Sequence, residues 1–479
     1  MKRLGLLFSL TILLCNYKVQ AQSRAWTLQE CIEYAVENNI SIQQSEMQIQ
    51  TSENTLQQSQ WGRWTPNASA TITQGANLGR SVDPYTNQFI QTAVYSTNAS
   101  LGLTLTLFNG FQQTNTIQRN MTSVEVNKLN TEQTKYNTAL NVALGYLQVL
   151  LNQELLEVAK KQTEVTRAQL ERTQKQYDAG AVPIINLTNL QAQLENDELA
   201  VVNAENQINL AKLNLMQLMN LSAAEKFDIA RVEIGDFEPK AYPQSVDEIY
   251  SIAETTQPGI KSADLSVQVS EMSYEISRGG RYPTLSLIGQ INTLYSSSAK
   301  RFITSTAGTQ AQVIGTVDGT GQTVSTLVPV TSRSEQDYGL VNQFADNFSQ
   351  FVGIRLNIPI LGAWQTRTTI RNNQINIENS KLTALNSRIQ LRQAIEQAFL
   401  NLKAAEKTYI ARGEQVKSLQ AAYDASEKSF NAGATNAVDF NIAKINLDRA
   451  KSDLVRAKYE YIFRTKVLDF YQNKPLTLE

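Results

Sequence analysis

The fold is decided by the stretch Leu101-Gly-Leu-Thr-Leu-Thr-Leu-Phe-Asn-Gly-Phe111. Its leucines alternate with glycine or threonine, which is the pattern of a β-strand with one apolar face and one polar face. A tilted strand of about nine to eleven residues is long enough to cross a bilayer. The stretch therefore predicts a membrane strand. A soluble hairpin with one buried face is the alternative.

Three further segments show the same alternation. The first follows Pro66, the second follows Pro283 with Leu285 and Leu287, and the third runs from Val352 to Ile360. Four strands in two pairs are therefore predicted. Polar residues at the alternate positions suit a water-filled lumen, and aromatic residues at the strand ends suit the membrane interfaces. The polar residues are Ser69, Thr71, Thr73, Thr104, Thr106, Arg355 and Asn357, and the aromatic residues are Trp64, Phe108, Phe111, Tyr282, Tyr295, Phe351 and Trp364.

The chain contains an internal duplication. Shifted by 253 residues, Phe111-Gln112 aligns with Trp364-Gln365, and Tyr177-Asp-Ala-Gly-Ala181 aligns with Phe430-Asn-Ala-Gly-Ala434. The register holds without a gap between these motifs. Long uninterrupted helices explain this constancy, because an insertion would rotate one helical face away from its partner.

Each half is predicted to begin with a capped helix. Thr27 with Glu30, and Ser245 with Glu248, have the spacing of a capping box. In the first half, apolar residues at helical spacing continue through 27–62. We expect a helix there, before the first strand.

Two very long helices are predicted after the strand pairs. Residues 112–177 and 365–430 contain no proline, and at ~1.5 Å per residue each helix would run roughly 100 Å. Heptad-like spacing indicates packing against neighbouring helices. Gly180 and Gly433 allow the positive φ of a turn, and returning helices follow near 186–220 and 439–471. The residues with heptad-like spacing are Val142, Tyr146, Val149 and Leu156, with Ile395, Phe399, Leu402 and Tyr409 in the second half.

The N-terminus predicts export. Lys2 and Arg3 precede an apolar run, and Val19-Gln-Ala21 has the small residues of a cleavage site, so residues 1–21 are expected to form a signal peptide. Cys15 follows Leu14 rather than a small residue, which leaves its lipidation open. The remaining organisation is a first repeat over 22–220, a linker or equatorial segment over 221–243, and a second repeat over 244–479 with a long extracellular loop near 296–349.

Composition argues against several classes of function, although it leaves catalysis by a Ser-Lys pair or by paired carboxylates open. The whole chain carries 43 basic and 44 acidic residues, and this balance argues against nucleic-acid binding, which needs a basic face. It has no histidine, the commonest general base and metal ligand. Cys31 is the single cysteine after the signal peptide, so that part of the chain has no disulfide or cysteine-based metal site. We expect no enzyme, cofactor, metal or transmembrane helix.

Four strands cannot close a barrel by themselves, because known membrane barrels begin at ~8 strands and an open edge leaves backbone groups unpaired in lipid. The chain is therefore expected to complete its barrel by association with further copies.

The plan of helix, proline, strand pair, long helix, glycine turn and returning helix resembles the TolC-like outer-membrane efflux protein family. Its local matches are Trp26-Thr-Leu-Gln-Glu-Cys31, Leu107-Phe-Asn-Gly-Phe111, Pro359-Ile-Leu-Gly-Ala-Trp364 and the two glycine turns. The resemblance implies an α+β membrane protein. Three protomers would share one transmembrane β-barrel, which continues into a long periplasmic coiled-coil α-barrel.

The resemblance also implies partners and site residues. The tip turns Ala179-Gly180-Ala181 and Ala432-Gly433-Ala434 would dock a periplasmic adaptor protein that connects the duct to an inner-membrane transporter. Asp439 would narrow the pore, and Ile442 replaces a second acid of the family. Thr435 and Asn186 replace the ion pair that latches the tip in relatives. The alternative for Asp439 is a helix N-terminal acid stabilised by the dipole.

These expectations describe a passive exit duct for efflux or type I secretion, in contact with outer-membrane lipid and extending into the periplasm. A soluble periplasmic coiled-coil adaptor or scaffold explains the helices but leaves the strands without a purpose. A secreted enzyme with a helical stalk lacks any clustered catalytic residues in the sequence. Neither the cargo nor the resting state of the gate follows from the sequence.

Overall fold

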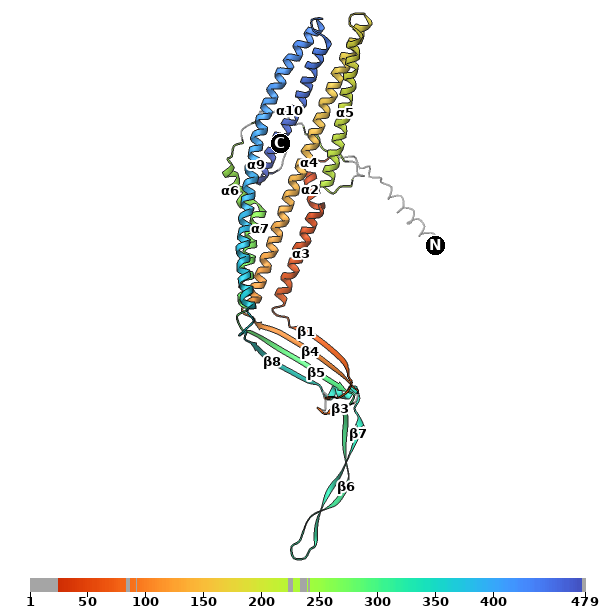
Figure 1. The fold of residues 1–479 in the computed structure, drawn as a ribbon, viewed down its shortest axis with the longest axis vertical. Helices are drawn as coiled ribbons and strands as arrows, with labels where there is room; N and C mark the ends of the chain where they lie inside the picture. Colours follow the sequence, from red (N-terminus) through yellow and green to blue (C-terminus); the bar gives the residue numbers. More distant parts are fainter. Residues whose placement is uncertain are drawn as a thin grey trace, which may run out of the picture. The chain divides into compact units, whose positions relative to one another are not determined.

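The computed structural model describes residues 25–82, 87–91, 93–222, 227–232, 239 and 242–475. The predicted signal peptide and Cys15 lie outside these residues. The chain divides into two compact units, whose elements are labelled in Figure 1. The sheet unit comprises Asn54–Asn120 and Glu271–Ile375, and the helical unit comprises the remainder.

The order of elements occurs twice along the chain. Corresponding helices have equal lengths of 11, 22, 67 and 35 residues. This equality is what a duplicated sequence without insertions produces in its helices. The first repeat contains α2 (Leu28–Asn38), α3 (Ile40–Trp61), β1 (Asn67–Asn77), β4 (Val94–Phe108), α4 (Gln112–Asp178) and α5 (Ile184–Leu218); the second contains α6 (Val246–Thr256), α7 (Pro258–Gly279), β5 (Thr284–Ser296), β8 (Ser349–Asn357), α9 (Gln365–Asn431) and α10 (Ala437–Tyr471).

Both predicted capping boxes are confirmed. The Thr27 hydroxyl accepts a hydrogen bond from Glu30 N at 3.3 Å, and the Glu30 carboxylate accepts one from Thr27 N at 2.9 Å. Ser245 and Glu248 exchange the same two bonds at 3.3 and 2.9 Å. Each box satisfies two backbone donors that a helix start leaves without intrahelical partners.

The prediction of one helix over 27–62 is wrong, because the helix is interrupted at Asn39, between α2 and α3. Asn39 is extended (φ −69°, ψ 123°), and its side chain accepts from Ser41 N at 2.9 Å, so it caps the second helix. In the second repeat the helix is interrupted at Gln257, which has nearly the same angles (φ −65°, ψ 123°). There Pro258 begins α7, a position where its missing N–H costs nothing.

The sheet unit contains a four-stranded antiparallel sheet in the order β1-β4-β5-β8. The alternating stretch that begins at Leu101 forms the second half of β4. Strand β8 ends at Asn357, so the alternation predicted to continue to Ile360 overruns the strand. Pro359 explains the end, because proline cannot donate to the ladder.

The strand registers collect apolar side chains on one face of the sheet. Ala68, Leu103, Gly289 and Val352 lie opposite one another across all four strands. Paired residues share a face, and residues two apart along a strand return to it. One face therefore carries Ala68, Ala70, Ile72, Leu101, Leu103, Leu105, Leu285, Leu287, Ile291, Val352, Ile354 and Leu356, while the other carries Ser69, Thr71, Thr104, Thr106, Ser286, Asn292 and Arg355.

The segment predicted as a long loop, 296–349, contains regular structure. Strands β6 (Lys300–Thr316) and β7 (Thr323–Asp337) form a long two-stranded ribbon, and the short helix α8 (Leu340–Asp346) follows. The residues of β6 are exposed throughout. In the first repeat, the described residues of the corresponding connection include two two-residue strands that pair, β2 (Ser81–Val82) and β3 (Phe89–Ile90).

Each strand-to-helix corner has a left-handed backbone. Phe111 (φ 64°) and Trp364 (φ 62°) occupy equivalent positions of the two repeats, although large side chains rarely adopt this region. Gly110 (φ 65°) precedes Phe111, and a Cβ there would lie 2.4 Å from the carbonyl oxygen of Gly279. Glycine is therefore required where the β4–α4 corner meets the end of α7.

Two apolar cores lie in the helical unit. Helix α2 packs on α4, α5 and α10 around Tyr146, which is fully buried and donates its hydroxyl to the Ala230 carbonyl at 2.8 Å. Helix α6 packs on α9 and α10 in the second core. No helix in the described part of the chain has both the length and the apolar composition needed to cross a membrane.

The duplication extends to an ion pair. Arg388 of α9 contacts Asp264 of α7 at 2.8 Å, and Lys135 of α4 contacts Glu46 of α3 at 3.4 Å. Lys135 is the residue 253 positions before Arg388. Both pairs join a long helix to the shorter helix that precedes the strands.

Candidate functional site

The two predicted tip turns have the same backbone geometry. Gly180 and Gly433 both have φ of 72°. Ala181 N donates to the Gln176 carbonyl at 2.8 Å, and Gly180 N donates to the Tyr177 carbonyl at 2.8 Å. These are the two bonds of a Schellman motif, which ends a helix at a left-handed glycine.

The second turn repeats this motif, with Ala434 N bonded to the Ser429 carbonyl at 2.9 Å. Both turns lie at the same end of the helical unit (Figure 1). Their six residues are exposed and so accessible to a partner in the single chain: Ala179, Gly180, Ala181, Ala432, Gly433 and Ala434.

Asp439 lies in the first turn of α10. Its carboxylate accepts from the side-chain amide of Asn436 at 2.9 Å, and the Asn436 side chain accepts from Asp439 N at 2.9 Å. Asp439 is therefore an acid in the first turn of α10, and Asn436 is the N-cap. Ile442 is 52% exposed and belongs to an apolar stripe with Val438 and Ile445, which are 55% and 38% exposed.

Asn186 and Thr435 are the residues that the family resemblance places at the ion pair of the tip. The helix starts beside them are capped differently. Asn186 lies in the first turn of α5, where Pro183 is the N-cap and makes no side-chain hydrogen bond. Thr435 precedes Asn436, which caps α10 through its side chain. Neither Asn186 nor Thr435 can form an ion pair.

A charged cluster between α5 and α10 was missed by sequence analysis. Lys444 Nζ lies 2.8 Å from Asp448 Oδ2 on the same helix and 3.3 Å from Asp197 Oδ2 on α5. The Lys444 side chain is only 3% exposed, and those of Asp197 and Asp448 are 12% and 19% exposed. Burial raises the pKa of the Asp448 carboxyl, although the neighbouring Lys444 ammonium opposes that shift.

Polar groups of α4 and α5 complete this cluster. The Thr166 hydroxyl and the Gln193 amide both donate to the Asp197 carboxylate, the latter at 2.7 Å. Gln162 of α4 donates to the Asp448 carbonyl at 3.0 Å. One signal in the sequence could have revealed the cluster, because Lys444 stands between the buried residues Phe440 and Leu447 at helical spacing.

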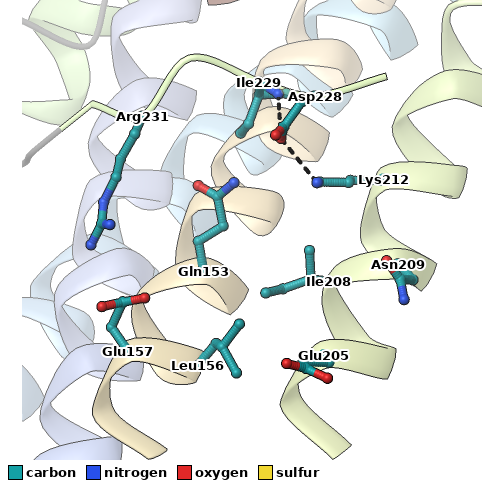
Figure 2. A pocket seen from close by; sticks show the side chains of 10 residues that line it. All are labelled: Gln153, Leu156, Glu157, Glu205, Ile208, Asn209, Lys212, Asp228, Ile229 and Arg231. Carbon is teal, nitrogen blue, oxygen red and sulfur yellow. Dashed lines mark hydrogen bonds and ion pairs between the residues drawn. The ribbon is translucent and has the colours of Figure 1, made fainter. Parts of the chain in front are cut away.

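A cavity of about 460 Å³ lies between α4, α5 and the segment 227–232. Figure 2 shows its lining, with Gln153 and Glu157 from α4 and Glu205 and Lys212 from α5. Asp228 accepts from Lys212 of α5 at 2.9 Å, which connects the segment to that helix. Within the segment it also accepts from Ile229 N at 2.9 Å.

Chemically reactive groups are sparse in the helical unit. The Cys31 thiol is fully buried, and burial raises its pKa to about 12. Among the described residues, no group of three or more histidine, cysteine, aspartate or glutamate side chains could hold a metal ion.

The fold occurs in a solved outer-membrane channel. The crystal structure of the Campylobacter jejuni CmeC outer membrane channel matches with a TM-score of 0.69 at 14% identity, covering 94% of this chain and 87% of that chain. The two chains thus share a fold.

The family follows from the sequence. The outer membrane efflux protein family matches residues 31–221 and 249–468, and the chain belongs to this family. Outer membrane protein TolC of Escherichia coli (strain K12) is 24% identical over 371 residues, which cover 77% of this chain and 67% of that protein. Outer membrane efflux protein BepC of Brucella suis biovar 1 (strain 1330) is 22% identical over 399 residues, which cover 83% and 75% of the two chains. The protein is thus an outer-membrane exit duct for efflux that extends into the periplasm, and its family is one of ducts rather than enzymes.

Proposed function

We propose that three copies of this chain form one continuous duct, with a shared transmembrane β-barrel and a periplasmic α-barrel. Substrate would leave an inner-membrane transporter, enter at the tip, and cross the periplasm and outer membrane passively. The duct itself would use neither ATP nor a proton gradient. Type I secretion is a second use of the same architecture.

The face pattern of the four-stranded sheet carries this proposal. Ile72, Val352 and Ile354 are 76%, 78% and 69% exposed on the apolar face, which is more apolar surface than a soluble sheet leaves uncovered. Lipid accounts for that face, and a water-filled lumen accounts for the opposite one. A soluble adaptor or scaffold has no use for such a sheet.

The strand order supports association with further copies. Strands β1 and β8 are the outer strands of the sheet, so each has a free edge within the described part of the chain. In lipid both edges need a partner. Pairing β1 of one copy with β8 of the next closes a ring, and three sheets of four strands give a twelve-stranded barrel.

The exposed tip turns support the proposed partners, an adaptor and a transporter. The exposed turns around Gly180 and Gly433 would dock a periplasmic adaptor, which connects the duct to the transporter. Three copies of Asp439 and Ile442 would line the constriction with fewer carboxylates and more apolar surface than two acid rings. We also assign residues 1–21 to a signal peptide, 22–220 and 244–479 to the two repeats, 221–243 to an equatorial belt, and the β6–β7 ribbon to the extracellular side.

Ion conductance tests this proposal. The full chain would be reconstituted into a planar lipid bilayer, and current recorded across it. Discrete channel currents are expected. Joining the tips of neighbouring copies through Ala179→Cys and Ala434→Cys should reduce them until a reductant is added, while either single variant should be insensitive to reductant. Absence of current from the unmodified protein at every applied voltage would contradict the proposal.

A further inference from the structure

The four junctions between helices and strands lie together at one end of the sheet unit (Figure 1). They comprise residues 62–66, 109–111, 280–283 and 358–364. The antiparallel registers bring the starts of β1 and β5 beside the ends of β4 and β8. Gln113 of α4 donates to the Ser59 carbonyl of α3 at 2.7 Å, and a Cβ at Gly280 would lie 3.5 Å from the Thr366 methyl group of α9. The junctions therefore form one continuous surface next to the sheet.

Four arginines of this surface have no carboxylate partner in the described part of the chain. All four are exposed, and we call them the junction arginines: Arg63, Arg281, Arg367 and Arg371. Two of them lie over indole rings, with Arg63 Cζ 5.2 Å from the ring centre of Trp64 and Arg367 Cζ 4.4 Å from that of Trp364. A cation–π contact holds a guanidinium in place and leaves its N–H donors available to an anion.

The sequence around the junctions contains few acids. None occurs in residues 54–66, 109–124 or 358–377. The remaining stretch, 271–283, contains Glu271 and Glu275, and Glu275 pairs with Arg278 at 2.9 Å. At the other end of the sheet, by contrast, Lys300 of β6 pairs with Asp337 of β7 at 2.9 Å. The junctions therefore carry an excess of positive charge that the protein itself does not neutralise.

The two repeats place an arginine and an aromatic residue in the same order. Arg63-Trp64 follows α3 and Arg281-Tyr282 follows α7, and each arginine is the second residue after its helix. The aromatic residue lies nearer the strand in both cases. Because aromatic rings favour the boundary of the hydrocarbon, a membrane around the sheet would place both arginines at the level of the lipid headgroups.

The β8–α9 junction has the same order in the opposite chain direction. Trp364 ends the connection, and Arg367 and Arg371 lie in the first two turns of α9. Long side chains of a helix lean toward its N-terminus, as Arg367 does over Trp364, so both guanidinium groups extend back toward the sheet. Residues four apart share one side of a helix, so the two arginines can approach the same headgroup.

We infer that the junction arginines bind the phosphate groups of anionic phospholipids in the leaflet on the periplasmic side of the membrane. The guanidinium fork matches a phosphate with two parallel hydrogen bonds. A headgroup with net negative charge is preferred over a zwitterionic one, because the latter also brings a cation among unpaired arginines. This inference rests on the proposed duct, since it requires the sheet to lie in the membrane.

Tryptophan fluorescence tests the inference, because three of the four tryptophans lie at or next to the junctions: Trp61, Trp64 and Trp364. The full chain would be reconstituted into vesicles of phosphatidylcholine and phosphatidylglycerol, with one lipid brominated so that it quenches nearby tryptophans. Phosphatidylglycerol should be enriched beside them about fivefold over its share of the mixture, the ratio that about 1 kcal/mol per basic residue near a membrane produces.

Glutamine at all four junction arginines should reduce this enrichment to about one, because the charge is removed. Lysine at the same positions keeps the charge and should keep the preference for the anionic lipid. The matched control removes four exposed charges of α4 in the helical unit and should keep the fivefold enrichment; it combines Lys160→Gln, Lys161→Gln, Arg172→Gln and Lys175→Gln. Quenching by brominated phosphatidylcholine shows that each variant has inserted, and circular dichroism shows that it keeps its helices.

Salt provides a test that needs no substitution. At about 1 M salt, where charges are screened within about 3 Å, the enrichment around the unmodified protein should fall toward one. Enrichment that survives this salt, or that persists in the glutamine variant, disproves the inference while the duct stands. Equal quenching by both lipids also disproves it, and is the result expected if these arginines face the lumen. If neither lipid quenches the unmodified protein, the sheet lies outside the membrane and the proposed duct itself fails.

Discussion

Helix α4 passes through two different environments, an apolar core and a region with buried charges. The contrast between them predicts how much each contributes to stability. Around Tyr146 and Leu147 it is surrounded by the apolar residues of α2, α5 and α10. Toward Gly180 its buried side chains are threonines, and α10 contributes Lys444 between the buried apolar side chains of Phe440 and Leu447. The apolar core favours a permanent association, because parting it exposes hydrocarbon to water. The buried contact of Lys444 with Asp197 and Asp448 adds less net stability than apolar packing, but loss of one partner is costly.

Changes in the apolar core around Leu147 should have the largest effect on stability. Leu147 is fully buried, so Leu147→Ala should lower the free energy of unfolding by about 2–5 kcal/mol. The duplication supplies a matched control in Leu400, which is 62% exposed in the single chain. In the unassembled chain, Leu400→Ala should leave helix melting, followed by circular dichroism, within about 0.5 kcal/mol of the unmodified protein. Equal losses from both variants would contradict the assignment of the core.

The stability of the protein should respond more weakly to changes in the buried contacts of Asp197. Asp197→Ala removes the acceptor for Thr166, Gln193 and Lys444, and should cost about 1–3 kcal/mol because buried donors lose their partner. Glu414→Ala breaks the exposed pair with Lys417 and should change stability hardly at all. Chemical denaturation measures both, and a cost for Asp197→Ala as small as that for Glu414→Ala would remove the contrast between buried and exposed pairs.

The tip turns test local geometry. Asn436 caps α10, so Asn436→Ala should cost about 1 kcal/mol. Asn436→Asp keeps an acceptor at the cap and serves as the conservative control. Hydrogen exchange of the amide of Asp439, which the cap holds, should accelerate in the alanine variant alone. Unchanged protection of that amide would show that the cap does not stabilise the turn.

The smallest effect concerns the thiol in the core. Burial raises the pKa of Cys31 from 9.0 to about 12, so the folded state favours the neutral thiol. Its contribution to stability is fully present below the unfolded pKa and is lost as pH rises through the folded value. At about pH 8, a thiol reagent should modify Cys31 slowly in the native protein and rapidly in denaturant, because the thiolate is the nucleophile. Equal rates would place Cys31 at the surface.

Periodicity revealed the regular parts of this molecule. The alternation of Leu101 to Leu107 predicted β4, and the lack of proline after residue 111 predicted α4 almost to its last residue. Capping boxes at Thr27 and Ser245 were visible because both partners are close in sequence. These signals depend on neighbours within a turn or two of the chain.

Features set by distant contacts were harder to predict. The break at Asn39 was missed because apolar residues continue on both sides of it, and the β6–β7 ribbon was hidden by its Gly- and Thr-rich composition. The partnership of Lys444 with Asp197 spans 247 residues, so no local pattern shows it. Only the burial of Phe440 and Leu447 on either side marks the position of Lys444 as a core position.

The mass of the detergent-solubilised protein, measured by light scattering with the detergent contribution subtracted, tests the central claim most directly. Three chains per particle are predicted, because the outer strands β1 and β8 each need a partner from another copy and three four-stranded sheets give the proposed twelve-stranded barrel. A particle of one chain that stays dispersed without detergent would contradict the account, because its apolar sheet face would then need neither lipid nor further copies.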